Sequence, residues 1–175
     1  GLGHQNIRII PDCIIELKAV KVLKLYRNPL ETRISGNLWK LTTLTYLHLA
    51  RCQLGSLPDA IGNLINLEEL SVSWNALTSL PNTLWNLRRM KTLYLSGNQL
   101  TEIPDTLGEN LLDLEFLHLS DNNLESIPQS FENLKKLRSL GLDGNSLTTL
   151  PNIFEKMTAM RSEGANLYIY DISTM

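Results

Sequence analysis

The stretch LEELSVSWNALTSL, residues 67–80, decides the fold because most of the chain repeats its spacing. Its apolar residues are Leu67, Leu70, Val72, Leu77 and Leu80, and Asn75 lies between them. The spacing returns every 23 or 24 residues, and the position of Asn75 is then occupied by Asn28, Cys52, Asn98, Asn122 and Asn145. A fixed period of this length is typical of a solenoid, whose units must stack because none can bury its apolar face alone.

Each unit contains an x-L-x-L-x segment, and its short alternation of apolar and polar residues predicts a β-strand. Stacked units would place these strands in one parallel sheet. About a dozen residues remain on the other side of each unit, where a proline and apolar residues three apart leave room for one or two turns of 3₁₀ or α-helix. Because this side is little wider than the strands, we expect gentle curvature.

The asparagine of each unit is expected to turn inward and bond the backbone of neighbouring turns, because its amide both donates and accepts hydrogen bonds. Stacked units would then form an asparagine ladder. Cys52 breaks this ladder conservatively, since a thiol is a small apolar group and a weak donor.

The pattern L-x-x-L-x-L-x-x-N/C-x-L resembles the leucine-rich repeat family, and six consecutive units match it. Most units add a Leu/Ile-Pro pair with apolar residues three and six positions on, as in Leu57, Pro58, Ile61 and Leu64. This detail is similar to the intracellular 23-residue LxxLPxxIxxL subclass of Ras-pathway and polarity scaffolds. The resemblance implies an α/β fold: a gently curved leucine-rich repeat solenoid with a parallel β-sheet on the concave face and short 3₁₀ or α turns on the convex face.

The unbroken period predicts one leucine-rich repeat domain over residues 1–175. It comprises a partial repeat at 1–19, six repeats at 20–159 and an irregular or capping segment at 160–175, where the register fails and the apolar LYIYDI follows. No polar cap opens the chain, so we expect a fragment of a longer protein. Two units are 24 residues long, one with Arg33-Ile34 in place of Leu-Pro and one with an extra residue at Glu109-Asn110. The first should bulge on the convex side.

Charge is unevenly distributed along the chain. Residues 1–60 carry a balance of +4 and residues 61–175 a balance of −6, within a formal net charge of −2. Such asymmetry can steer a charged partner but does not specify a fold.

Cysteine usage bears on the compartment. Cys13 and Cys52 are the only cysteines, and the sequence has no Asn-x-Ser/Thr sequon. Both features favour a reducing, cytoplasmic setting, although cysteine caps or sequons outside this sequence would allow an extracellular one. No apolar run approaches the roughly 18 residues that a membrane span needs.

No catalytic, cofactor or metal motif survives inspection. Phosphate-binding glycine loops, His-Glu-x-x-His and Cys-x-x-Cys are absent from the sequence. His48 and His118 share a column but stand three strands apart, about 14 Å, which is too far for one metal ion. We therefore expect no enzyme activity, no cofactor and no metal site.

Residues between the strand leucines should point out of the concave face. The predicted partner-binding site consists of the aromatic, basic and histidine residues among them: Lys24, Tyr26, Arg27, Tyr46, His48, Arg51, Trp74, Tyr94, Phe116 and His118. Exposed aromatic and arginine side chains dominate the binding energy of protein interfaces. They could instead simply cover neighbouring strands. Trp39 and Trp85, in the convex segments, are expected to be partly exposed covers without a binding role.

These features favour a non-enzymatic protein-interaction module that binds an acidic or mixed epitope and acts in intracellular signalling or scaffolding. The small basic patch and mildly acidic chain argue against nucleic acid. Two alternatives stay open: the recognition domain of a larger kinase, phosphatase, GTPase or ubiquitin ligase, or a segment of a secreted or surface receptor. The fold serves all of these and cannot choose among them.

Overall fold

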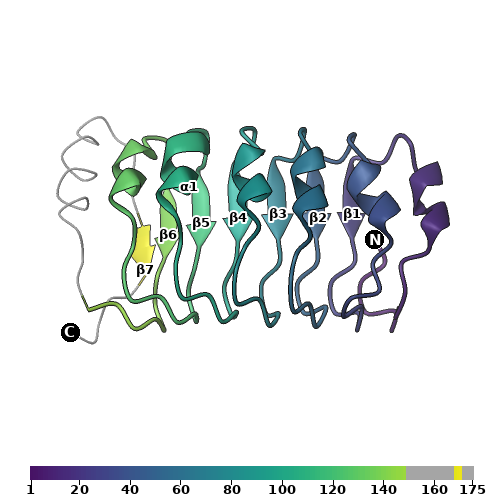
Figure 1. Cartoon of the computed structure of the whole chain (residues 1–175), viewed down its shortest axis with the longest axis horizontal. Helices are drawn as coiled ribbons and strands as arrows, with labels where there is room; N and C mark the ends of the chain where they lie inside the picture. Colours follow the sequence, from purple (N-terminus) through teal and green to yellow (C-terminus); the bar gives the residue numbers. More distant parts are fainter. Residues whose placement is uncertain (149–167, 171–175) are drawn as a thin grey trace.

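A single parallel sheet runs the length of the molecule (Figure 1). The computed structural model describes residues 1–148 and the backbone of residues 168–170. Within these residues, seven three-residue strands pair in chain order: β1 (Val22–Lys24), β2 (Tyr46–His48), β3 (Glu69–Ser71), β4 (Thr92–Tyr94), β5 (Phe116–His118), β6 (Ser139–Gly141) and β7 (Tyr168–Tyr170). The register sets one buried leucine of each unit opposite the next: Leu23, Leu47, Leu70, Leu93, Leu117 and Leu140. The predicted α/β solenoid is confirmed.

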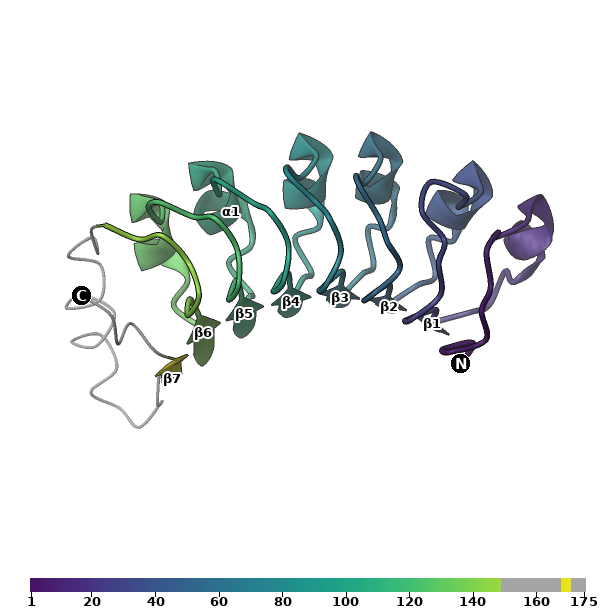
Figure 2. The same cartoon turned by 90° about the horizontal axis from the view of Figure 1, so that it is seen from below.

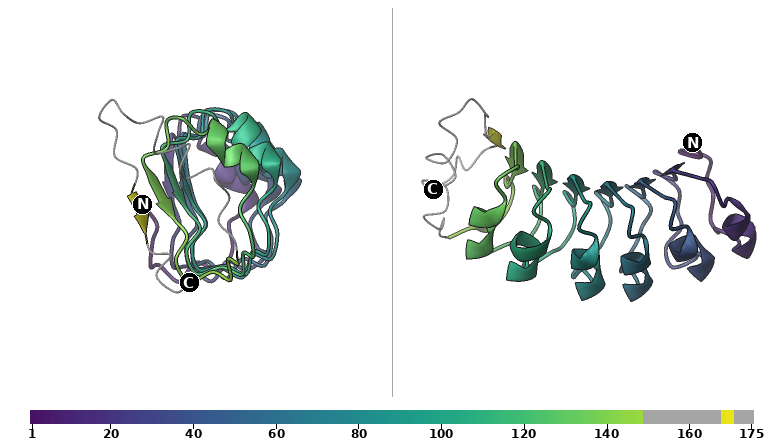
Figure 3. Two further views of the ribbon diagram at one scale, coloured as in Figure 1. Left: turned by 90° about the vertical axis from the view of Figure 1, so that its left-hand side faces the viewer. Right: turned by 90° about the horizontal axis from the view of Figure 1, so that it is seen from above.

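One short helix lies opposite each gap between strands. They are the 3₁₀ helices η1 (Asp12–Glu16), η2 (Gly36–Lys40), η3 (Asp59–Asn63), η4 (Asn82–Asn86) and η5 (Gln129–Asn133) and the α-helix α1 (Asp105–Asn110). Figure 2 shows the strands on the inner side of a shallow arc and the helices on the outer side, and Figure 3 shows the same arc from above. The helices stand farther apart than the strands, which bends the stack gently, as expected.

The prolines act as helix start signals. Extended prolines immediately precede five of the six helices: Pro11, Pro58, Pro81, Pro104 and Pro128. Proline has a fixed φ and no N–H to leave unpaired, so it suits this position. The exception is η2, where Ser35 is the N-cap and its hydroxyl accepts a hydrogen bond from the Asn37 amide at 3.1 Å.

The two longer units accommodate their additional residue differently. The insertion at Glu109-Asn110 extends the helix by one residue, and α1 is α-helical where the other units are 3₁₀. The unit with Arg33-Ile34 instead leaves a convex pocket of about 320 Å³ against the next unit, lined by residues that include Ile34, Trp39 and Leu57. The predicted departure from the repeat therefore takes the form of a hollow beside η2.

The asparagine ladder is confirmed. The Asn98 side chain accepts a hydrogen bond from the Leu77 amide at 3.1 Å and donates to the carbonyls of Val72 and Leu95 at 3.2 and 2.8 Å. Asn28, Asn75, Asn122 and Asn145 make equivalent bonds to the preceding turn. The ladder thereby satisfies backbone groups that have no strand or helix partner.

Cys52 interrupts the ladder and the backbone compensates. Its thiol donates to the Leu25 carbonyl at 3.2 Å, as an asparagine amide would, but it offers no oxygen acceptor. The Cys52 carbonyl instead accepts hydrogen bonds from the amides of Leu30 and Glu31. This arrangement requires positive φ angles at Glu31 and Gln53. Burial raises the pKa of the Cys52 thiol, which fits a structural role.

Leucine side chains fill the space between sheet and helices, and most of them are fully buried. Trp39 and Trp85 belong to this core, because only 3% and 2% of their surfaces are exposed. The expectation that both are partly exposed is wrong. Their large rings fill the widest part of the unit beside η2 and η4, where they precede buried Leu41 and Leu87.

The end of the chain extends the sheet. Strand β7 pairs in parallel with β6 and sets Ile169 opposite Leu140, 29 residues away, so the spacing differs from that of the other units. This strand contains the apolar Tyr168–Tyr170 stretch of the predicted capping segment. The predicted boundary at residue 159 and the expected strand positions Glu163 and Ala165 lie outside the described residues.

Candidate protein-binding site

The concave face carries four columns of side chains. The first two columns come from the strands and flank the buried leucine of each strand. The third and fourth follow the strands, and the fourth contains Arg27, Arg51 and Trp74. Backbone hydrogen bonds hold this fourth column, because the amides of these residues donate to Ala50, Ser73 and Ser96 on the next turn at 2.7–2.9 Å.

Aromatic and histidine rings form a continuous layer over β1 and β2. Tyr26 stacks on His48 with ring centroids 4.8 Å apart, and its other side meets the His4 ring edge-on at 5.2 Å. Tyr46 contacts His48 edge-on at 6.2 Å, and Lys24 places its ammonium 5.2 Å from the Tyr46 ring. Such ring pairs and cation–π contacts restrain side chains that would otherwise move freely.

The column that follows the strands continues this layer. The Arg51 guanidinium lies 4.8 Å from the centre of the Trp74 ring. The indole extends over Gly97, since a Cβ at Gly97 would lie 2.5 Å from it, and 48% of the Trp74 surface remains exposed. Trp74 therefore has one side packed on the solenoid and another available to a partner.

Two carboxylate and tyrosine groups extend the site toward β4. Burial raises the pKa of Glu69 on β3, while Tyr46 and Lys24 oppose this rise. Burial and the Glu69 charge raise the pKa of Tyr46 and of Tyr94. Glu69 thus lies among three predicted site residues, although the sequence analysis did not assign it to the site. Its position in the first column, opposite Tyr46, was the available signal.

A second, smaller group lies toward β6. Tyr94 and His118 contact each other with centroids 5.2 Å apart, and the His118 Nε2 atom lies 3.3 Å from the Ser139 hydroxyl. Phe116 is half-buried in the first column. The structure therefore brings Lys24, Tyr26, Arg27, Tyr46, His48, Arg51 and Trp74 into one patch, here called the basic-aromatic patch, and sets Tyr94, Phe116 and His118 beside it.

Both predicted site histidines are neutral bases at pH 7. Burial lowers the pKa of His48, and the Lys24 charge lowers it further; burial also lowers the pKa of His118, while Asp143 opposes that shift. The two histidines are separated by β3 and β4. Within the described part of the chain, no three metal-ligating side chains come together, and no helix is long and apolar enough to cross a membrane.

Comparisons with known proteins agree with this architecture. A family model described as leucine-rich repeat region matches residues 2–109, and a second, described as leucine rich repeat, matches residues 88–147. A comparison with curated proteins finds no significant match.

Solved structures with this fold include a leucine-rich repeat protein of Leptospira interrogans, with 32% identity and a TM-score of 0.72 over 86% of this chain. An internalin of Listeria monocytogenes has 24% identity and a TM-score of 0.73 over 94% of the chain, and the PEPR1–AtPEP1 structure has 29% and 0.71 over 85%. The chain spans 44%, 47% and 22% of these three proteins, less than half of each. The repeat pattern, the parallel solenoid and the family model that matches more than half of the residues show that this chain belongs to the leucine-rich repeat family.

Proposed function

We propose that this chain is a non-enzymatic recognition module that binds a protein partner through the concave face. The observation that carries the proposal is the basic-aromatic patch, in which seven predicted site residues are contiguous and several rings are held in place before any partner arrives. Exposed Trp, Tyr and Arg side chains supply most of the binding energy at protein interfaces. Restrained side chains lose less conformational entropy on binding.

The partner is proposed to present an acidic or mixed epitope to the first turns. Lys24, Arg27 and Arg51 lie in this part of the face, whereas Asp121 and Asp143 lie on the last described turns. The similar PEPR1 was solved with AtPEP1, which agrees with a binding role for a solenoid of this kind.

We further propose an intracellular signalling or scaffolding setting. The LxxLPxxIxxL pattern supports it, as do Cys13 and Cys52, which are both free thiols. Because the chain spans less than half of the three similar structures, the recognition module is proposed to be one part of a longer protein.

Affinity enrichment from a cell extract tests the proposal. The double variant Arg51→Glu, Trp74→Ala should lose captured partners by more than about tenfold relative to wild type, equivalent to about 1.4 kcal/mol or more. Both side chains project from the solenoid, so circular dichroism and the Tm should show an intact fold.

The matched control is Lys135→Glu, an exposed charge reversal between η5 and β6. It should capture the same partners as wild type. Normal capture by the double variant together with loss in the control would move the binding site to the convex side and reject the concave-face proposal.

A further inference from the structure

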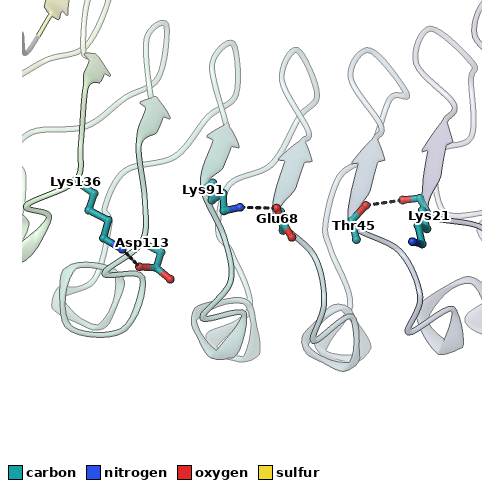
Figure 4. Close-up of polar contacts among 6 residues, drawn as sticks. All are labelled: Lys21, Thr45, Glu68, Lys91, Asp113 and Lys136. Carbon is teal, nitrogen blue, oxygen red and sulfur yellow. Dashed lines mark hydrogen bonds and ion pairs between the residues drawn. The ribbon is translucent and has the colours of Figure 1, made fainter.

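Arg27 and Arg51 have no acidic partner, although cations elsewhere on the solenoid do. At the opposite edge, where strands begin, ion pairs join neighbouring turns: Lys91–Glu68 at 2.7 Å and Lys136–Asp113 at 2.5 Å, both drawn in Figure 4, and Arg138–Glu115 at 3.2 Å. Within residues 1–148, neither Arg27 nor Arg51 forms an ion pair. Two guanidinium groups on adjacent turns are therefore left for a ligand.

The backbone at these arginines is unfavourable for a large side chain. Arg27, Arg51 and Trp74 have φ angles of 55°, 56° and 58°, in the left-handed region. The equivalent residues of other turns are Gly97 and Gly144, with φ of 68° and 66°. Glycine adopts this conformation without a steric cost, whereas a bulky L residue does not. The first turns thus retain large side chains where glycine would fold more easily, a pattern that occurs at functional sites.

The two arginines border a pocket of about 320 Å³, which His4, Tyr26, His48 and Ala50 also line. The flat rings of Tyr26 and His48 stack on each other and can contact the methylene groups of an inserted side chain. Guanidinium groups bind carboxylates through paired, charge-assisted hydrogen bonds. Because the pKa of His48 is lowered by burial, its ring adds a polar wall rather than a third cation at pH 7.

We propose that this pocket binds the carboxylate of an aspartate or glutamate side chain on the partner, with Arg27 and Arg51 as its two ligands. The proposal rests on the concave-face function and names the group that the partner presents. A glutamate suits the pocket well, since its stem is apolar and its carboxylate matches the planar fork of arginine.

Titration of the purified chain with three probes at low ionic strength tests the proposal by ¹H–¹⁵N NMR. The probes are an N-acetylated, C-amidated peptide with two glutamates, the same peptide with glutamines, and inorganic phosphate. The glutamate peptide should shift the Nε–H signals of Arg27 and Arg51 saturably, with a Kd in the millimolar range or tighter. The glutamine peptide should not.

Variants separate a binding role from a structural one. Arg27→Asn and Arg51→Asn should each weaken the glutamate peptide by at least about fivefold. The Tm of Arg27→Asn should stay constant or rise by up to about 4 °C, because asparagine adopts the left-handed conformation more easily. The control Arg89→Asn removes an exposed arginine between η4 and β4 and should change neither quantity.

Several results would overturn the assignment: equal shifts with the glutamine peptide, tighter binding of phosphate, an equal loss in Arg89→Asn, or a fall of more than about 4 °C in the Tm of Arg27→Asn. If the glutamate peptide does not bind but Arg51→Glu, Trp74→Ala still abolishes partner capture, the concave-face function stands and only the carboxylate pocket is wrong. If both assays fail, both proposals fall.

Discussion

At the scale of single residues, the asparagine ladder shows how one side chain replaces missing backbone partners. Asn98 is 7% exposed and bonds three backbone groups on its own and the preceding turn. A buried polar group left without a partner costs free energy, because it has given up water without compensation. The ladder therefore contributes to stability through the groups it satisfies.

We expect Asn98→Ala to lower the free energy of unfolding by about 1–3 kcal/mol, because the Leu77 amide loses its acceptor. Urea titration followed by circular dichroism measures this loss. The control is Asn123→Ala, an exposed asparagine one residue after the ladder position of the next unit, which should change stability by less than about 0.5 kcal/mol. Equal effects of the two variants would contradict the role of the ladder.

His48 should make stability depend on pH. Burial and Lys24 lower its folded pKa, so the unfolded chain binds the proton more tightly. The contribution of His48 is thus fully present above the unfolded pKa of about 6.5 and is lost as pH falls through the folded value. Lys24, Tyr26, Tyr46, Arg27 and Arg51 surround the ring, and the three cations all disfavour its protonation.

The Tm of wild type should therefore fall more than that of His48→Gln between about pH 7.5 and about pH 5.5. Differential scanning calorimetry at both pH values gives the comparison. His118 and Glu69 remain in both proteins and cancel to first order. Parallel Tm curves for the two proteins would show that protonation of His48 is not penalised in the folded state.

At the scale of elements, close packing between helices of neighbouring units limits what the convex side can contain. A Cβ added to Gly108 in α1 would lie 2.3 Å from the carbonyl oxygen of Ser130 in η5. Gly36, in η2, has no heavy atom within 4 Å of the same position. The two glycines therefore differ in packing although both lie in helices.

Gly108→Ala should destabilise the fold by about 1–3 kcal/mol, because α1 and η5 must move apart. Gly36→Ala should be neutral or stabilising by up to about 1 kcal/mol, since alanine reduces the freedom of the unfolded chain. Thermal unfolding of both variants tests this contrast. A Gly108→Ala protein as stable as Gly36→Ala would mean that the helices are not in contact as described.

At the scale of the whole molecule, charge reverses along the arc. The first turns carry Arg27 and Arg51 beside the strands, and the last described turns carry Asp121 and Asp143 at the corresponding edge. The sequence balance of +4 before residue 61 and −6 after it follows the same direction. An acidic partner should therefore be attracted to one end and repelled from the other.

Added salt should accordingly weaken the complex of the wild-type chain with a captured partner, and weaken it more than the residual binding of Arg51→Glu, Trp74→Ala. Screening shortens the range of these charges to about 3 Å at 1 M ionic strength. Binding isotherms at low and high salt measure the effect, with Lys135→Glu expected to match wild type. A salt-independent Kd would show that the basic residues do not contribute to binding.

Period and local alternation in the sequence determined the parallel strands, the buried leucines, the asparagine ladder and the short helices after proline. These features could be predicted because each depends on contacts between a turn and the identical position of the next turn. Even the 24-residue units were visible, since Leu47 pairs with Leu23 and Leu117 with Leu93.

Only the tertiary structure decided which concave side chains are exposed and which are joined. Ser71 and Thr92 are buried there although they point outward, whereas Trp74 is half exposed above Gly97. The left-handed backbone at Arg27 and Arg51, the place of Glu69 beside Tyr46 and the burial of Trp39 and Trp85 likewise escaped the pattern. The physical reason is that exposure depends on how a side chain lies across the next turn, and the size of its neighbour there is independent of the repeat that places both.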